Sequence, residues 1–275
     1  MNDGRFRPKK RFGQNFLHDR GIAARIVDAT RIQPGDVVVE LGPGHGVLTR
    51  LIAERGARVI ALELDRGLVE ELRAEFAGRP DIDVVSADFT KVSLGELLGA
   101  RGLERCVLIG NIPYHLTRDV MFDFLVDEFG SIARATIMMQ REVGDRIASP
   151  PGSRAYGIPS VVLQSLYDID VVARVGAGAF SPPPKVASIV LSFRPLARPL
   201  VEGDEFRPFI TLVKNVFQQR RKTVHSTLRA FYSLSEEALL RIHDETGIDL
   251  QSRPEVLSKE AFLSLSRSVS AARVS

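Results

Sequence analysis

The sequence predicts an α/β fold that is organised around a mostly parallel β-sheet and followed by a small all-α domain. Short apolar runs alternate with helical patterns from residue 37 to residue 139, which is typical of β-α-β units with parallel strands. Two β-rich runs without a helix between them follow at residues 168 to 194. Residues 206 to 268 carry helical patterns only, so we expect a first domain at residues 1–200 and a second at residues 201–275.

The strands of the parallel sheet are expected to be short and apolar on both faces, because helices cover such sheets on either side. A helical pattern at Ile22, Ile26 and Ala29 precedes them, and Pro34-Gly35 ends it. We expect strands at residues 37–41, 59–62, 82–85, 107–109 and 135–139, and helices at residues 47–55, 66–76 and 116–129.

The end of the first domain differs from the alternating part. The runs 168–175 and 186–193 are separated by Gly, Ser and Pro residues, and we expect them to form a hairpin-like antiparallel edge on the sheet. The composition changes again after Arg194-Pro195, so the domain boundary is expected near residues 196 to 204. Ser235, which two glutamates follow, is typical of a helix start in the second domain.

Charge is distributed unevenly along the chain. The net charge of +3 is too small to indicate a nucleic-acid partner by itself. The N-terminal arm, residues 1–19, is strongly basic, and residues 206 to 231 contain six basic side chains and no acidic one. Either run taken alone is equally well explained as a solvated surface. The arm contributes Arg5, Arg7, Lys9, Lys10 and Arg11.

Cysteine and histidine usage argues against metal and disulfide chemistry. Cys106 is the single cysteine, which allows neither an intrachain disulfide nor a cysteine zinc site, and the five histidines lack ligand spacing. We therefore expect no metal. The sequence shows neither a signal-peptide pattern nor an apolar stretch of about 20 residues, so a cytoplasmic location is expected.

A glycine-rich turn follows the first predicted strand, at residues 42–46. Glycines there permit a tight turn and the close approach of a ligand, although a turn without a ligand would look the same. Glu63 ends the second strand and Asp88 follows the third, so both should gather at the carboxyl edge of the sheet. The G-x-G-x-G spacing differs from that of NAD enzymes, and no cation accompanies it. This combination suits S-adenosylmethionine, which carries a ribose, an adenine and a sulfonium but no phosphate.

The segment Asn111-Ile112-Pro113-Tyr114 follows the fourth strand at the same edge. Adenine N6 is a poor nucleophile because its lone pair is delocalised into the ring. The amide oxygen of Asn111 and the carbonyl of Ile112 could accept its two N–H groups and stabilise the positive charge that develops on the nitrogen. Tyr114 offers a ring on which a base can stack. A strand-end turn with a buried tyrosine is the plain structural alternative.

These motifs, taken together, resemble the ribosomal RNA adenine N6-dimethyltransferase family, and within it the bacterial enzymes of 16S rRNA. The resemblance covers nearly the whole chain and implies a Rossmann-like class I methyltransferase sheet. Its motifs are Lys10–Leu17, Glu40–Thr49, Glu63-Leu64-Asp65, Asp88-Phe89, Asn111–Tyr114 and Phe180–Val186.

The resemblance implies roles for individual residues. Asn111 would bind the target amine as well as the neighbourhood of the cofactor, and Phe180 and Tyr114 would stack on the two faces of the target adenine. The implied cofactor-binding residues are Asn15, Leu17, Gly42, Gly44, Glu63, Asp88 and Asn111. The implied reaction is N6-dimethylation of two adjacent adenines near the 3′ end of 16S rRNA, in the 30S subunit or an assembly intermediate. A monomer is the default expectation for the oligomeric state.

The basic segment Arg220-Arg221-Lys222 resembles a region of the family's second domain that would bind RNA phosphates. The chain departs from the family here, because Val224-His225-Ser226 stands where relatives commonly carry an asparagine.

Three other functions remain open. An Erm-type 23S rRNA adenine methyltransferase shares the core motifs, although the basic segment and Arg253-Pro254-Glu255 favour the 16S enzymes. A mainly non-catalytic 30S assembly factor could retain the same cofactor pocket. A dehydrogenase is disfavoured by the glycine spacing.

Overall fold

The computed structural model describes residues 14–273, so most of the predicted basic arm, including Arg5 to Arg11, lies outside the described residues. The chain forms two compact units. The first consists of the residues up to Gly144 together with Ile169–Pro195, and the second consists of Asp145–Asp168 together with the residues from Leu196 onward. The chain passes between the units after Gly144, after Asp168 and after Pro195. The second unit also takes in residues 145–168, which the sequence places in the first domain.

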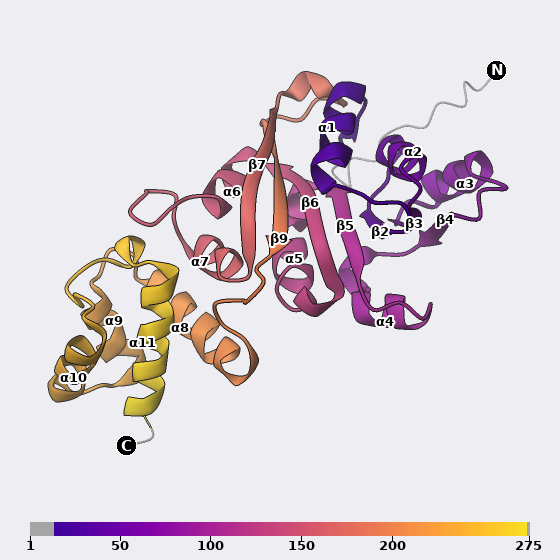
Figure 1. Ribbon diagram of the computed structural model, residues 1–275. Coiled ribbons are helices and arrows are strands. Elements are labelled where there is room, and N and C mark those ends of the chain that lie inside the picture. Colours follow the sequence, from indigo (N-terminus) through magenta and orange to yellow (C-terminus); the bar gives the residue numbers. More distant parts are fainter. Residues whose placement is uncertain (1–13, 274–275) are drawn as a thin grey trace. The chain divides into compact units, whose positions relative to one another are not determined.

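Within residues 14–273, a seven-stranded sheet forms the centre of the first unit, in the order β4-β3-β2-β5-β6-β9-β7 (Figure 1). The predicted α/β fold class is confirmed, and each predicted strand is present, several of them extended by one to three residues. The strands are β2 (Val37–Leu41), β3 (Arg58–Glu63), β4 (Ile82–Ser86), β5 (Cys106–Asn111), β6 (Ile132–Gln140), β7 (Tyr167–Val175) and β9 (Ser188–Pro195).

The register brings the strand ends that matter to one edge of this sheet. Strands β4, β3, β2, β5 and β6 run parallel, and Leu41 lies opposite both Leu62 and Gly110. Strand β9 runs antiparallel to β6, as the sequence predicts for this edge of the sheet. The residues that follow β2, β3, β4 and β5 therefore meet at the carboxyl edge, where open α/β sheets bind ligands.

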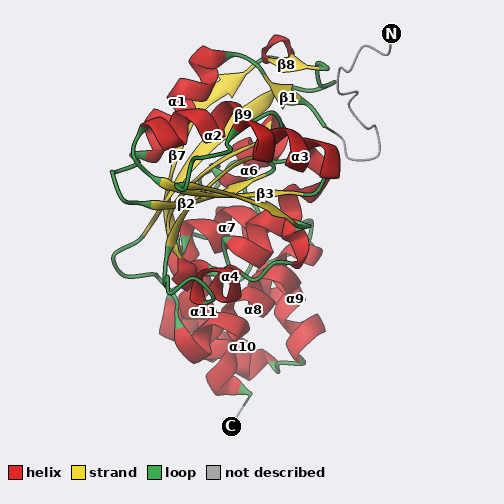
Figure 2. Cartoon of the chain, turned by 90° about the vertical axis from the view of Figure 1, so that its right-hand side faces the viewer, coloured by secondary structure: helices red, strands yellow, loops and turns green. Residues whose placement is uncertain are grey.

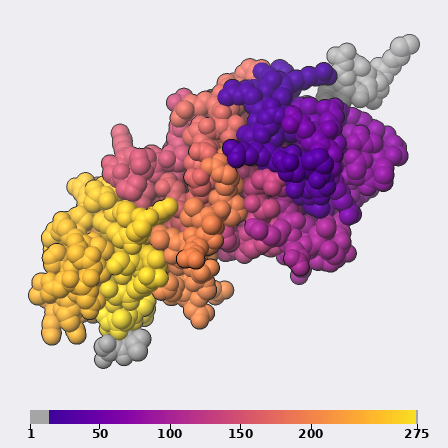
Figure 3. All heavy atoms as spheres, in the orientation of Figure 1, coloured from indigo at the N-terminus to yellow at the C-terminus, as the bar shows by residue number. Residues whose placement is uncertain are grey.

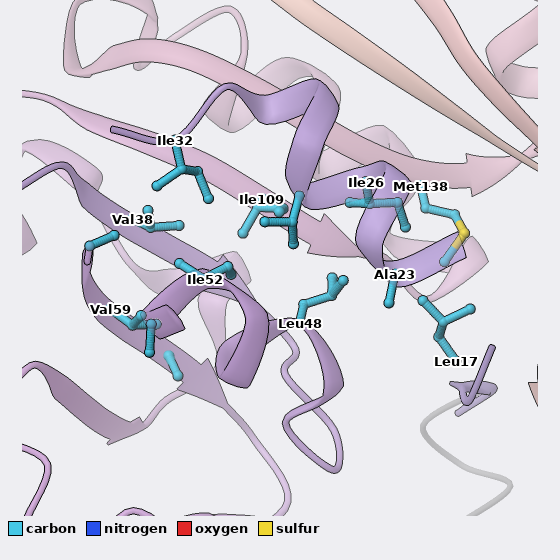
Figure 4. Close-up of a cluster of buried hydrophobic side chains, with 14 of the residues drawn as sticks. Leu17, Ala23, Ile26, Ile32, Val38, Leu48, Ile52, Val59, Ile109 and Met138 are labelled. Atoms are coloured by element: carbon cyan, nitrogen blue, oxygen red, sulfur yellow. The ribbon is translucent and has the colours of Figure 1, made fainter. Parts of the chain in front are cut away.

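Helices α1 (Arg20–Thr30), α2 (Val47–Glu54) and α3 (Arg66–Glu75) lie on one side of the sheet, and α4 (Leu94–Gly99) lies on the other (Figure 2). Figure 4 shows the core between the sheet and the helices α1 and α2, where Ile26 and Ile52 from the helices approach Val59 and Ile109 from the strands. Each of these four side chains is fully buried. Burial of one such side chain contributes about 1.5–3 kcal/mol, which fixes the helices on the sheet.

A second sheet joins two distant segments of the first unit. The short strands β1 (Phe16–Leu17) and β8 (Phe180–Ser181) pair antiparallel (Figure 2). The amide of His18 continues the connection by donating a hydrogen bond of 3.0 Å to the carbonyl oxygen of Ala179. The sequence does not predict either strand.

The predicted helix at residues 116–129 is wrong as a continuous α-helix. The segment consists of a 3-10 turn (Tyr114–Leu116), one α-helical turn, α5 (Thr117–Asp119), a π-helical turn (Val120–Phe124) and a second 3-10 turn (Phe129–Ser131). Val120, Met121 and Phe124 remain buried, so the apolar pattern is satisfied without regular helix. Short π-helical turns occur frequently next to functional sites.

The second unit is helical, as predicted for its C-terminal part. Ser235 accepts a hydrogen bond of 3.2 Å from the amide of Ala238, so the predicted helix start is confirmed. The helices are α7 (Ile158–Gln164), α8 (Phe206–Gln218), α9 (Val224–Tyr232), α10 (Glu236–Thr246) and α11 (Lys259–Ala272), and α6 (Arg141–Ile147) leads into the unit from the first one. Among residues 14–273, no helix combines the length and the apolar character that crossing a membrane requires.

Candidate active site

A cavity of about 240 Å³ opens at the carboxyl edge of the large sheet. Its lining comes from the residues after β2, β3, β4 and β5, from the segment before β1, and from β8. The sequence-predicted residues that line it are Asn15, Gly42, Gly44, Glu63, Asp88, Asn111, Tyr114 and Phe180. The fold thus brings together eight of the nine residues that the resemblance assigns to the cofactor and the target base.

Leu17 is the exception. Its side chain is 6% exposed, belongs to the hydrophobic core and does not line this cavity. It lines a smaller adjoining cavity of about 30 Å³ together with Glu40, Gly42, Gly44 and Asn111. Leu17 therefore contacts the site from behind, and its strand partner Phe180 faces the larger space.

The glycine turn adopts a backbone that other residues avoid. Gly42, Gly44 and Gly46 all have φ between 58° and 72°. A Cβ atom on Gly44 would also lie 2.8 Å from the Phe16 ring, closer than real Cβ contacts permit. The turn therefore needs glycine at this position for both conformation and space.

Glu63 is held by the backbone at the mouth of this turn. Its side chain is 6% exposed, and its two oxygens accept hydrogen bonds from the amides of Gly44 (3.2 Å) and Asp65 (2.9 Å). Burial raises the pKa of the carboxyl group, and these hydrogen bonds counteract the rise. The carboxylate is thus fixed in orientation beside the glycine turn.

Glu40 is a second buried carboxyl group, directly before the turn. Its side chain is 1% exposed, and one oxygen accepts a hydrogen bond of 2.6 Å from the hydroxyl of Thr49 on α2. Burial raises the pKa of Glu40 to about 7, against the lowering effect of Thr49, and the charge of Glu63 adds to the rise. Glu40 therefore titrates near neutral pH in the folded protein.

This raised pKa makes stability depend on pH in a defined direction. A carboxyl group whose pKa is higher in the folded state stabilises the fold below about pH 4.5, and that stabilisation is lost as the pH rises through about 7. Glu40→Gln imitates the protonated form at every pH and keeps an acceptor for Thr49. We expect the unfolding free energy of the variant, relative to that of the unmodified protein, to increase by about 2–3 kcal/mol between pH 5 and pH 8. Urea unfolding at both pH values measures it, and a pH-independent difference would contradict the assignment.

Asp88 is oriented by the residues that follow it. One carboxylate oxygen accepts hydrogen bonds from the hydroxyl (2.6 Å) and the amide (3.2 Å) of Thr90. The other lies 3.6 Å from the ammonium group of Lys91, whose side chain is 80% exposed. The carboxylate thus has one oxygen fully engaged and one directed to a solvent-exposed partner.

Asn111 ends β5, and its amide group is oriented by the N-terminal segment. Its Nδ2 donates a hydrogen bond of 3.1 Å to the carbonyl oxygen of Asn15. This contact assigns the amide so that Oδ1 is the atom left to accept a hydrogen bond from a ligand. The neighbouring Ile112 is anchored through its own amide, which donates to the carbonyl of Met138 at 3.1 Å.

Two aromatic side chains stand beside Asn111. The hydroxyl of Tyr114 forms a hydrogen bond of 2.8 Å with the hydroxyl of Ser188, a buried residue on β9. Phe180 is 3% exposed, so it serves both as part of the core and as part of the cavity lining. The sequence does not single out Ser188, although it follows the Phe180–Val186 motif by two residues.

The sequence also misses apolar residues of the lining, of which Leu64 and Phe89 are the clearest. Leu64 is 45% exposed although it is large and apolar, and it directly follows Glu63. The signal in the sequence is a leucine between two acidic residues at the end of a predicted strand. Among residues 14–273, no Lys or Arg side chain lines the cavity, and two carboxylates do. Among residues 14–273, no group of three or more His, Cys, Asp and Glu side chains is placed to hold a metal ion.

The basic segment lies in the second unit, in the break between α8 and α9. Arg220 donates a hydrogen bond of 2.5 Å to the carbonyl oxygen of Arg154 and lies 3.8 Å from a carboxylate oxygen of Glu255. Arg221 and Lys222 are exposed. Arg220 therefore connects two other segments of its own unit, whereas Arg221 and Lys222 face solvent. His225, where the chain departs from the family, pairs with Glu236 at 2.9 Å.

Two solved structures share this fold with the chain. A dimethyladenosine transferase from Plasmodium falciparum matches with a TM-score of 0.76 and 22% identity, over 91% of this chain and 95% of that one. The 23S rRNA methyltransferase ErmE matches with a TM-score of 0.72 and 28% identity, over 93% of this chain and all of that one. Fold and cavity together define a class I methyltransferase.

The model of the family described as "Ribosomal RNA adenine dimethylase" matches residues 5–270, and the chain belongs to this family. Among its curated relatives, the ribosomal RNA small subunit methyltransferase A of Geobacter metallireducens is 42% identical and that of Chlorobium phaeobacteroides 41%. The first alignment covers 96% of both chains, and the second covers 94% of this chain and 92% of the relative. The resemblance stated from the motifs is confirmed.

Proposed function

We propose that the chain uses S-adenosylmethionine to dimethylate N6 of two adjacent adenines near the 3′ end of 16S rRNA, and that this step belongs to the assembly of the 30S subunit. The observation that carries the proposal is one cavity whose lining contains Asn111 with its amide oriented, two oriented carboxylates and two aromatic side chains. Relatives at 37–42% identity that are named small subunit methyltransferase A support the choice of 16S rRNA. We further propose that the enzyme acts as a monomer.

The residues present fit S-adenosylmethionine. Gly44 leaves room that a Cβ atom would fill, and Glu63 presents an oriented carboxylate that suits ribose hydroxyl groups. The carboxylate of Asp88 suits the amine of the cofactor's adenine. Two carboxylates line the cavity, and its described lining contains no Lys or Arg, which suits a cationic ligand without phosphate. When bound, the cofactor supplies a methyl group on a sulfonium.

Asn111 and Ile112 would hold and activate the target amine. The Oδ1 atom of Asn111 and the carbonyl oxygen of Ile112 accept the two N–H groups of adenine N6, which directs the nitrogen lone pair toward the methyl carbon. With the cofactor bound, its sulfonium would supply the methyl group to N6 and leave as a neutral thioether, and the amine would pass its extra proton to water. Both acceptors stabilise the positive charge that N6 carries before this release. Catalysis is thus mainly a matter of position and electrostatics.

Tyr114 and Phe180 would enclose the target base after it has left its stack. A base that reaches a buried cavity must leave its stack in the RNA. Stacking on an aromatic side chain contributes about 1–3 kcal/mol of binding free energy and offsets this cost. The hydrogen bond between Tyr114 and Ser188 holds one ring in place, and the burial of Phe180 holds the other. Two rings held in this way would enclose a planar base with little loss of side-chain entropy.

We expect the three basic residues of the second unit to affect RNA binding unequally. The double variant Arg221→Gln, Lys222→Gln removes two exposed charges. The negative slope of log K against log salt should therefore become flatter, its magnitude falling by about 1.5–2. Arg220→Gln should change the slope less and lower the melting temperature, because Arg220 ties Arg154 to Glu255. Filter binding to 16S rRNA between 50 and 300 mM salt measures the slopes. An unchanged slope in the double variant would show that these two residues do not touch phosphate.

The function is tested by transfer of labelled methyl groups from S-adenosylmethionine to 30S and 50S particles from a strain that lacks the modification. We expect N6,N6-dimethyladenosine in 16S rRNA alone. Label in 23S rRNA would instead favour an enzyme of the ErmE kind, with which the chain shares its fold. Absence of label in both, with 30S binding retained, would favour an assembly role without catalysis.

A further inference from the structure

The second unit contains a cavity that the proposed methyl transfer does not use. It has a volume of about 530 Å³ and lies between α8, the end of α9 and α11. Its polar lining consists of Arg207, Thr211, Tyr232, Ser266, Ser270 and Arg273. Helices α8 and α11 lie next to each other, and their atoms adjoin on the face seen in Figure 3, orange beside yellow.

The chemistry of this lining selects an anion. Among the described residues that line it, two are arginines, four carry a hydroxyl group and none is an aspartate or glutamate. Within the described part of the chain, neither Arg207 nor Arg273 forms an ion pair. The nearby Glu205 is neutralised by Arg267, whose guanidinium donates two hydrogen bonds of 2.7 and 2.8 Å to it. The two arginines of the cavity thus keep their charge for a ligand.

Tyr232 adds an aromatic surface to the two charges. The guanidinium carbon of Arg273 lies 5.8 Å from the centre of the Tyr232 ring. The phenol oxygen accepts a hydrogen bond of 3.1 Å from Asn215, which orients the ring. Burial raises the pKa of the Tyr232 hydroxyl, so it stays neutral and can donate a hydrogen bond to an anion. Arginines, hydroxyl groups and a held aromatic ring together suit a phosphate that carries a nucleoside.

We propose that this cavity binds a backbone phosphate of the RNA substrate, as a second contact separate from Arg221 and Lys222. The proposal rests on the proposed function, because a substrate RNA is what supplies phosphodiesters to this enzyme. Arg207 comes from the first turn of α8 and Arg273 from the end of α11, so the two charges approach the anion from different helices. A free phosphate offers the same chemistry, and the experiment separates the two sources.

The test compares two double variants. The cavity variant carries Arg207→Gln and Arg273→Gln, and the control variant carries Arg198→Gln and Arg241→Gln. The control residues are exposed arginines of the same unit outside the cavity, so both variants lose two charges. We expect the cavity variant to bind 16S rRNA about tenfold more weakly at 0.1 M salt, and the magnitude of its salt slope to fall by about 1–2. The affinity and the slope of the control variant should change much less. Arg207→Lys with Arg273→Lys should keep the slope and lose affinity, because lysine lacks the guanidinium fork.

Methyl transfer separates this inference from the function on which it rests. The cavity variant should raise the KM for RNA and keep kcat, with a melting temperature equal to that of the control variant. If the unmodified protein methylates 16S rRNA but cavity and control variants bind it equally, the inference is wrong and the function stands. If neither the unmodified protein nor any variant methylates RNA, the proposed function itself is wrong. If inorganic phosphate raises the melting temperature only when both arginines are present, while the RNA slopes are equal, the cavity is a free-anion site and the RNA contact is overturned.

Discussion

Asn111→Ala is expected to lower kcat by about 100- to 1,000-fold while leaving the affinity for 16S rRNA within about twofold. Removing one preorganised group that stabilises developing charge costs this much in other enzymes. The Oδ1 atom of Asn111 is such a group, because its Nδ2 is already engaged by the carbonyl of Asn15 at 3.1 Å. Single-turnover methyl transfer at saturating RNA measures the first quantity, and filter binding measures the second.

Asn111→Asp supplies the matched comparison. Aspartate keeps an acceptor oxygen of the same reach but loses the donor for Asn15, so this variant should retain more turnover than Asn111→Ala. An Asn111→Ala variant that loses RNA binding in proportion to turnover would show that the residue supports the fold of the site and does not act on the amine.

Gly44→Ala is expected to weaken the binding of S-adenosylmethionine more than tenfold. Its Cβ atom would lie 2.8 Å from the Phe16 ring, and φ at this position is +58°. The ring must therefore move within the cavity that it lines, and the amide that donates to Glu63 must shift with the strained backbone. Titration calorimetry with the purified protein measures the affinity.

Gly35→Ala is the control for backbone strain. Gly35 has φ of +86°, and a Cβ atom there would meet nothing within 4 Å. Backbone strain should cost each variant about 1–2 kcal/mol of folding free energy, and the contact with Phe16 adds to this loss in Gly44→Ala. Only Gly44→Ala should lose cofactor affinity. Equal affinities for the cofactor in the two variants would contradict the placement of the cofactor at the glycine turn.

The parallel sheet and the centre of the site follow from the sequence for a clear physical reason. Strands buried on both faces are continuous apolar runs, so β2 was predicted to the residue and β5 was found from its middle. Parallel strands also end at one edge, so polar residues placed just after them must gather there. Glu63 and Asn111 end two parallel strands of this kind, β3 and β5, so the sequence alone predicts that they lie at the same edge.

Other features depend on long-range contacts that leave no local pattern. A strand of two residues such as β1 has no periodicity, and it exists only because Phe180–Ser181 lies beside it. The predicted helix after Tyr114 shows the converse, since an apolar pattern records burial and not the type of turn that achieves it. Arg220 could not be told from Arg221 by sequence either, because only the fold brings Glu255 and the Arg154 carbonyl to it.

The pairing of β1 with β8 determines when the protein can begin to work. Phe16 and Ser181 lie on either side of almost the whole sequence of the large sheet. Strand β8 follows β1 to β7 in the chain, so this pair cannot close until Phe180 and Ser181 have been synthesised. The wall formed by Phe16 and Phe180 is thus completed in one late step of synthesis. A nascent chain that already contains Gly44, Glu63 and Asn111 accordingly remains unable to enclose its ligands until the strand that carries Phe180 arrives.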